Sequence, residues 1–217
     1  EVFKKILENG LLFSKVNFAI EDISIKNDAV CFTDVPLNMM DGHVKNYGKF
    51  AIGFKKEFVK NSGGNPVLYF VDHTTINGLR GIISSNLKTI LKFTVSNYKI
   101  LKEDGSEYNS NELKDNLMQF LSHCKEIGDL GPPSDGSERV DAYFVEREWR
   151  IVRYNRHKDL EMLTTIDEQH YLKTTVDDIR TIIVPNKDIA RMVIEYLQES
   201  GTKNIPIIIE YDELKYL

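Results

Sequence analysis

The clearest pattern of apolar and charged positions lies at residues 142–153, where β-branched and aromatic residues interleave with charged ones. Such interleaving is typical of a β-strand. Because side chains on a strand alternate between two faces, we expect Glu146, Glu148 and Arg150 on one face. Two carboxylates about 6–7 Å apart can raise each other's pKa and share a guanidinium. The pattern indicates an acid/base or cation-stabilising site, or else a solvent-facing strip of alternating charge.

Apolar runs and turn residues divide much of the remaining chain into helices and strands. Helices are expected near residues 2–9, 39–47, 55–60 and 186–199, and strands near residues 29–35, 49–54, 66–71, 180–184 and 205–211. Asn186 is expected to cap the last helix. The strand–helix–strand tail permits a parallel pair, although the connection also suits distant strands of a mixed sheet. The segments between residues 14 and 28 and between residues 154 and 170 are polar or weakly patterned.

Two further apolar stripes, at steps of three and four residues, predict a helical insertion over about residues 74–127. The second stripe starts near Asn111, and Cys124 continues it. We interpret both stripes as core rather than as a cofactor site. The following loop, about residues 128–141, is rich in Gly and Pro and long enough to act as a flap. The sequence therefore predicts an α+β fold in a single domain over residues 1–217.

Composition narrows the class of protein. The chain has 217 residues, 41% of them hydrophobic and 28% charged, which is typical of globular proteins. It has no apolar run of about 18 residues and no signal segment, so we expect no membrane association. Cys31 and Cys124 are expected to be reduced thiols of a cytoplasmic protein, without metal-ligand spacing. The chain begins with Glu1 rather than Met, inside an expected helix, so the sequence leaves open whether natural residues precede Glu1.

Four separated blocks of sequence carry a family resemblance. They are CFTDVPL at residues 31–37, YGKFAIGF at 47–54, GNPV at 64–67 and EREWRIV at 146–152. In this order and spacing, the blocks resemble the AbiGi-like abortive-infection family of bacterial phage-resistance proteins. The blocks span somewhat over half of the chain. The resemblance implies a phage-defence protein, of the abortive-infection or toxin–antitoxin type, with a toxin or antitoxin as its protein partner.

A more distant resemblance connects these blocks to the ADP-ribosyltransferase-like folds, in which a split mixed β-sheet grips NAD. It implies that Glu148 is the catalytic glutamate, that Glu146 stands where some members have a second acid, and that Phe32 and Thr33 lie on the second-strand motif. The first-strand His or Arg of such enzymes would precede the opening helix, where this sequence begins. Either that residue lies before Glu1 or this chain is not a working transferase.

The chemistry implied by this resemblance assigns a role to each candidate. Cleavage of the nicotinamide–ribose bond passes through an oxocarbenium-like state, which Glu148 would stabilise. Glu146 would act as a general base. Arg150 would bind a pyrophosphate, or else form a salt bridge with one of the glutamates. Tyr47 would stack on nicotinamide or simply pack. NAD would be the co-substrate, and no metal is expected.

Three hypotheses about function follow. The first is an NAD-dependent ADP-ribosyltransferase-like effector that acts on a macromolecule. The second is a catalytically inactive, antitoxin-like binding module that pairs with a toxin. The third is a nucleic-acid-binding component, which would use the lysine cluster at positions 45, 49, 55, 56 and 60. The net charge of -5 weighs against the third.

Overall fold

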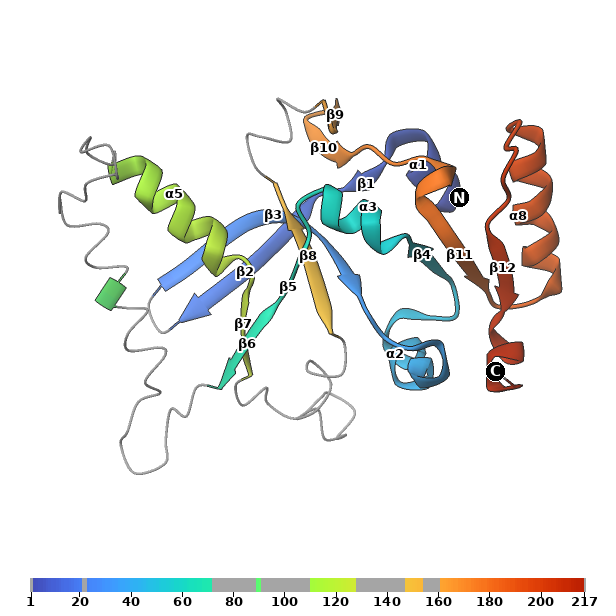
Figure 1. The fold of residues 1–217 in the computed structure, drawn as a ribbon, viewed down its shortest axis with the longest axis horizontal. Helices are drawn as coiled ribbons and strands as arrows, with labels where there is room; N and C mark the ends of the chain where they lie inside the picture. Colours follow the sequence, from blue (N-terminus) through green and yellow to red (C-terminus); the bar gives the residue numbers. More distant parts are fainter. Residues whose placement is uncertain are drawn as a thin grey trace. The chain divides into compact units, whose positions relative to one another are not determined.

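The computed structural model describes residues 2–20, 23–71, 89–90, 110–127, 147–153 and 161–216 (Figure 1). The chain forms two compact units, each assembled from separate stretches of sequence. Unit 1 comprises Glu1–Phe13, Phe32–Asn65 and Tyr154–Leu217, and unit 2 comprises Ser14–Cys31 and Pro66–Arg153. The single domain expected from the sequence stays a prediction. Apart from residues 89–90, the first stripe of the expected insertion and the expected flap at residues 128–141 lie outside the described residues.

Unit 1 contains a three-stranded mixed sheet in the order β12-β11-β4 (Figure 1). Strand β11 (Ile179–Val184) pairs in parallel with β12 (Ile207–Glu210) and antiparallel with β4 (Ala51–Phe54). Helix α8 (Lys187–Glu199) connects the two parallel strands. The tail is therefore a strand–helix–strand unit with a parallel pair, and the predicted α+β class is confirmed.

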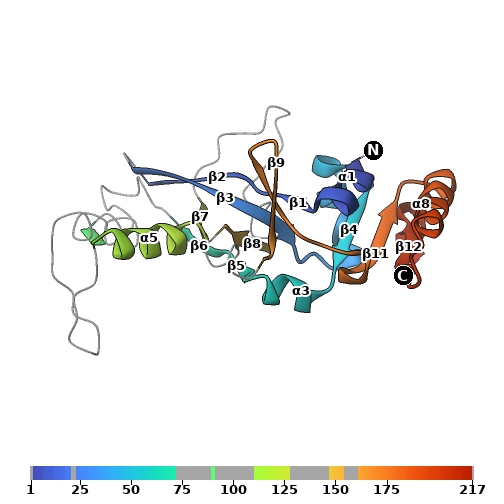
Figure 2. The same cartoon turned by 90° about the horizontal axis from the view of Figure 1, so that it is seen from above.

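One face of this sheet packs against α8 and α1 (Val2–Asn9). Buried residues from all three elements form one core, namely Phe3, Ile179, Ile182, Val184, Val193 and Leu197. Figures 1 and 2 both show α8 running beside β11 and β12. As predicted, the Asn186 side chain caps α8, because its Oδ1 accepts a hydrogen bond of 3.1 Å from the Ile189 amide.

The other face of the sheet is covered by α2 (Met40–Tyr47), which follows directly on η1 (Leu37–Met39), and by η3 (Tyr211–Tyr216). Met40, Ile183, Tyr211 and Leu214 form the core there. The predicted helices at residues 39–47 and 55–60 are confirmed, the second as α3 (Lys56–Asn61). The turn η2 (Val176–Asp178) leads into β11 and is held by a Thr175–Asp178 capping box.

A second sheet of unit 1, in the order β1-β10-β9, was not expected from the sequence. It consists of β1 (Leu11–Leu12), β9 (Leu163–Ile166) and β10 (Gln169–Leu172). Strands β9 and β10 form a tight hairpin whose turn residues, Asp167 and Glu168, have φ angles of 49° and 64°. Such turns usually contain glycine. Because neither turn residue is glycine here, the sequence did not indicate a hairpin.

Unit 2 contains a long antiparallel hairpin, of which the sequence predicted only the end of the second strand, within the strand expected near residues 29–35. Strand β2 (Ser14–Ile20) pairs with β3 (Ile23–Thr33) over Ser14↔Ala29 to Ile20↔Ile23. The sheet continues in the order β2-β3-β8-β5, with β8 (Glu148–Val152) and β5 (Asn65–Pro66). Strand β8 lies within the central stretch predicted from the sequence, whereas Arg147, which was predicted to belong to the strand, lies in a turn before it with a φ angle of 44°.

The second half of the expected insertion is only partly helical. Helix α5 (Ser110–Leu121) is followed by β7 (Cys124–Ile127), which pairs in parallel with β6 (Leu68–Val71). The prediction that Cys124 continues the helix is wrong. The helix ends in a turn, in which the Ser122 hydroxyl donates to the Met118 carbonyl (2.7 Å), and Cys124 then pairs with Leu68. Pairing with a distant strand overrides the local helical pattern.

Candidate functional site

The candidate site in unit 2 is built around Glu148, the first residue of β8. Arg150 lies two residues further along the strand and therefore on the same side. Its Nε donates a hydrogen bond to Glu148 Oε1 at 2.7 Å. Lys125 on β7 donates from Nζ to Glu148 Oε2 at 2.8 Å. Each oxygen of the carboxylate thus accepts a hydrogen bond from a cation.

A further contact fixes the guanidinium of Arg150. Its Nη1 donates to the carbonyl oxygen of Ser122 at 2.7 Å, in the turn between α5 and β7. The salt bridge with a glutamate, one of the two roles predicted for Arg150, is thus present and is formed with Glu148. Lys125 and Ser122 were missed by the sequence analysis, because the segment that holds them was interpreted as the end of a helix.

Burial and charge determine the ionisation of this pair. Glu148 is 8% exposed and Arg150 is 4% exposed. Burial by itself raises the pKa of Glu148, but the hydrogen bonds and charges of Arg150 and Lys125 outweigh it and leave the pKa below its usual value. The pKa of Arg150 is raised because its burial is outweighed by the bond to Glu148. Both groups are charged at neutral pH.

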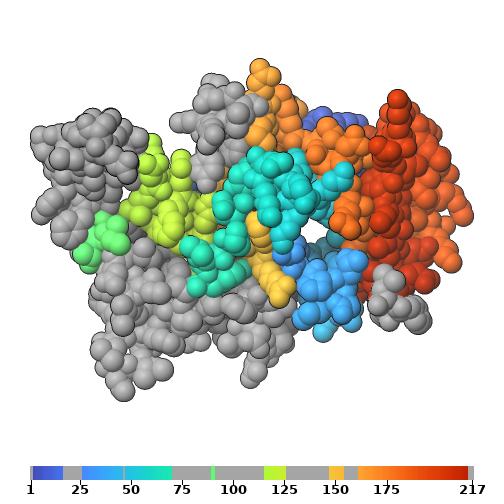
Figure 3. Space-filling model, viewed as in Figure 1, coloured from blue at the N-terminus to red at the C-terminus, as the bar shows by residue number. Residues whose placement is uncertain are grey.

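An open hollow of about 300 Å³ lies beside Glu148 and is lined by Pro66, Val67, Tyr69 and residues 147–149. Figure 3 shows residues 65–71 and β8 packed side by side there. The Val67 amide donates to the Glu148 carbonyl at 2.8 Å, and the Leu68 amide donates to the His123 carbonyl at 2.7 Å. The segment that contains β5 and β6 thus changes its pairing partner here, from β8 to β7. The volume is at the low end for a small-molecule pocket.

The two cysteines are free thiols, as the sequence predicts. Although Cys31 is an exposed residue, desolvation of its thiol and the negative charge of Glu148 raise its pKa to about 12. Burial raises the pKa of Cys124 as well. Both thiols therefore stay protonated at neutral pH, which does not suit a nucleophile.

The other predicted cofactor-binding residues lie in unit 1. The ring of Phe32 packs edge-on against Phe54, with centroids 5.7 Å apart. Thr33 is exposed at the end of β3. Tyr47 is exposed, with its ring 4.4 Å from the ring of His43. Glu146 lies outside the described residues. Binding of NAD by these residues, and the catalytic roles of Glu148 and Glu146, stay predictions.

Two members of the lysine cluster form surface ion pairs within unit 1. Lys49 Nζ lies 3.2 Å from Asp212 Oδ1, and Lys56 Nζ lies 2.9 Å from Asp34 Oδ2. These carboxylates offset part of the positive charge that a phosphate backbone would need.

Comparisons with known proteins identify a family. Residues 17–185, more than half of the chain, match a family described as "Putative abortive phage resistance protein AbiGi, antitoxin". No curated protein and no solved structure matches the chain. Among the described residues, no helix has the length and apolar character needed to cross a membrane. The match over residues 17–185 shows that the chain belongs to the AbiGi family of abortive phage resistance proteins.

Proposed function

We propose that this protein is the antitoxin of a phage-defence pair and that it acts by binding a toxin protein. The observation that carries this proposal is the match of residues 17–185 to a family described as an antitoxin. It corresponds to the second of the three hypotheses drawn from the sequence. A protein that neutralises its partner by occupying it needs a stable fold and a complementary surface, but no reactive group.

The geometry around Glu148 supports a binding role over catalysis. A carboxylate that stabilises an oxocarbenium-like state must face the sugar with its negative charge available. Here Arg150 and Lys125 hold both oxygens at 2.7 and 2.8 Å, so two positive charges surround the carboxylate. Such an arrangement suits a buried ion-pair network that fixes β8 against β7.

The competing hypothesis is the NAD-dependent transferase, which the Glu146-x-Glu148 pattern favours. It would make the protein an effector that modifies a macromolecule in the cytoplasm. It differs from the antitoxin proposal in one decisive respect, because it requires NAD turnover that depends on Glu148.

Growth assays separate the two hypotheses. Expression of the toxin encoded beside this gene should arrest growth, and co-expression of this protein should restore it. Because binding needs no catalytic carboxylate, a folded Glu148→Gln variant should restore growth as well as the wild type. Cellular NAD should be unchanged when the wild type or Glu148→Gln is expressed without the toxin. NAD loss caused by the wild type and abolished in Glu148→Gln would instead support the transferase.

A further inference from the structure

In the mixed sheet of unit 1, two neighbouring rows of cross-strand residues on the same face differ in how far other side chains cover them. On the face packed by α2 and η3, the row Ala51–Ile183–Ile209 is covered by Met40, Tyr211 and Leu214. The neighbouring row on the same face is Gly53–Thr181–Ile207. Its outer member, Ile207, is 61% exposed. An apolar side chain on a strand therefore faces solvent at this end of the sheet.

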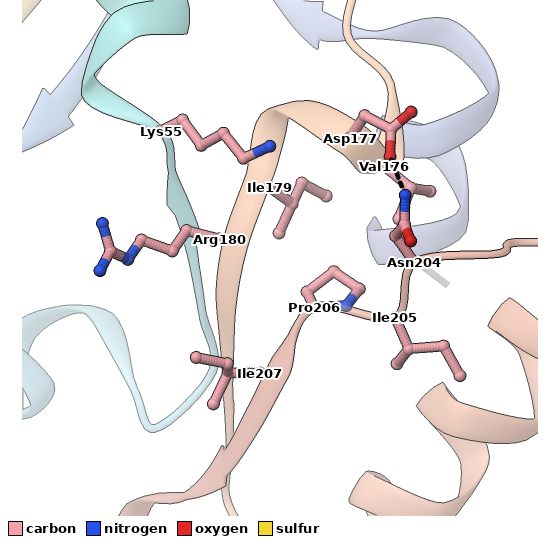
Figure 4. Close-up of a pocket in the computed structure, with 9 residues that line it drawn as sticks. All are labelled: Lys55, Val176, Asp177, Ile179, Arg180, Asn204, Ile205, Pro206 and Ile207. Atoms are coloured by element: carbon pink, nitrogen blue, oxygen red, sulfur yellow. Dashed lines mark hydrogen bonds between the residues drawn. The ribbon is translucent and has the colours of Figure 1, made fainter.

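A hollow of about 270 Å³ lies at this end of the sheet, and we call it the β12 hollow (Figure 4). Its apolar lining is formed by Val176, Ile179, Ile205, Pro206 and Ile207. Ile205 is exposed as well as Ile207. Exposed apolar side chains around a concavity are typical of a surface that binds another molecule.

Two cations flank the β12 hollow. Lys55 follows β4, and its amide donates to the Asp178 carbonyl at 2.8 Å, which anchors the lysine beside η2. In Figure 4 the Lys55 ammonium is directed toward the hollow, whereas the Arg180 side chain extends from β11 away from Pro206 and past β4. No described carboxylate forms a salt bridge with either side chain within 4.0 Å.

A β-bulge sets the position of Arg180. Ile179 pairs with Phe54 and Thr181 pairs with Gly53, so Arg180 is an extra residue on β11. The bulge keeps Ile179 and Ile182 in the same core although they are three residues apart. Bulges often re-aim a side chain next to a functional site.

The remaining charge at the hollow is a carboxylate. Asp177 Oδ1 accepts a hydrogen bond of 3.5 Å from Asn204 Nδ2. The lining thus carries two cations, one carboxylate and exposed isoleucines, which leaves a net positive rim around an apolar centre.

We propose that the β12 hollow docks a segment of the partner toxin that carries an apolar anchor next to an acidic side chain. The apolar anchor packs on the exposed isoleucines, and the acidic group pairs with Lys55, while Arg180 adds positive charge beside the hollow. A protein segment fits better than nucleic acid, since a phosphate backbone offers nothing to cover two exposed isoleucines. This inference rests on the proposed antitoxin function and specifies the surface it uses.

Calorimetric titration of this protein with the toxin encoded beside its gene tests the apolar part of the surface. Ile207→Asp should weaken binding at least about tenfold, because it places a carboxylate where the anchor packs. The matched control is Met192→Asp, since Met192 on α8 is 63% exposed and lies outside the hollow. That variant should bind within about twofold of the wild type.

Charge reversal tests the rim. Arg180→Glu should weaken toxin binding and flatten its salt dependence, whereas Arg191→Glu on the exposed side of α8 should change neither. If the wild type binds the toxin and both Ile207→Asp and Arg180→Glu bind equally well, the docking surface is wrong while the antitoxin function stands. If the wild type does not bind the toxin, the antitoxin function itself fails. Loss of binding to single-stranded RNA in Arg180→Glu, with toxin binding intact, would assign the hollow to nucleic acid and overturn the proposal.

Discussion

At the scale of single residues, the ion pair of Glu148 and Arg150 should contribute strongly to the stability of unit 2. Arg150→Met leaves the buried carboxylate with Lys125 as its remaining cation. Breaking a buried pair on one side costs about 3–5 kcal/mol, because the remaining charge is poorly compensated. We expect a loss in this range in the free energy of unfolding, measured by urea denaturation.

The control is Lys15→Met, which changes a matched pair at the surface. Asp28 is also held by two cations, since Lys15 Nζ lies 2.6 Å from Asp28 Oδ1 and Arg153 Nη2 lies 3.1 Å from Asp28 Oδ2. The Lys15 side chain is mostly exposed, so its loss should cost less than about 1 kcal/mol. Equal losses in the two variants would show that burial does not strengthen the Glu148 pair.

A second residue gives the stability a dependence on pH. Burial lowers the pKa of His123 below its usual value of 6.5, and the positive charge of Arg150 lowers it further. The unfolded chain therefore binds a proton at His123 more readily than the folded chain does. The contribution of His123 is fully present above about pH 6.5 and is lost as the pH falls below that value. The slope due to this residue is at most about 1.4 kcal/mol per pH unit.

Denaturation curves at several pH values check this expectation. In His123→Gln, the loss of stability between about pH 6.5 and 5 should be smaller than in the wild type. Glu148 and Asp28 have lowered pKa values, so their contributions to stability are present above their usual pKa values of 4.5 and 3.8 and are lost only at lower pH. An unchanged slope between pH 6.5 and 5 in the variant would remove His123 from this account.

At the scale of elements, α8 should stabilise unit 1 through one face alone. Leu197 is fully buried in the core shared with β11. Leu197→Ala should therefore cost about 2–5 kcal/mol, the usual range for truncation of a buried leucine. Met192→Ala on the exposed face of the same helix should change the free energy of unfolding by less than about 0.5 kcal/mol. A large effect of Met192→Ala in the isolated protein would mean that this face is covered.

Elements with strong local signals were predictable from the sequence. The strand–helix–strand order of the tail was predicted from the apolar stripe of α8, its Asn186 cap and the Ile-rich strands on either side. These features were also compatible with the parallel pair that the structure shows. The hairpin β9–β10 was missed because Asp167 and Glu168 adopt positive φ angles without a glycine. In the hairpin β2–β3, residues 29–33 of β3 fall within a predicted strand, whereas β2 was missed although Val16, Phe18 and Ile20 alternate with smaller or polar residues along it.

At the scale of the whole molecule, the candidate site was only half predictable. The spacing of Glu148 and Arg150 on one strand indicated that they would meet, and they do. Lys125 and His123 could not be assigned to this place, because the parallel pairing of β6 with β7 joins residues more than 50 positions apart. No local periodicity encodes such a pairing, and the helical pattern before Cys124 favoured the wrong element.

The family match and the engaged carboxylate lead to one account, in which this protein works by occupying a toxin. Its central claim is a direct complex of the two proteins. Size-exclusion chromatography with light scattering measures the mass of such a complex in a mixture of the purified partners. We expect one species with the summed mass, formed equally with and without NAD and equally with Glu148→Gln. Two separate peaks at micromolar concentrations of both proteins would contradict the account.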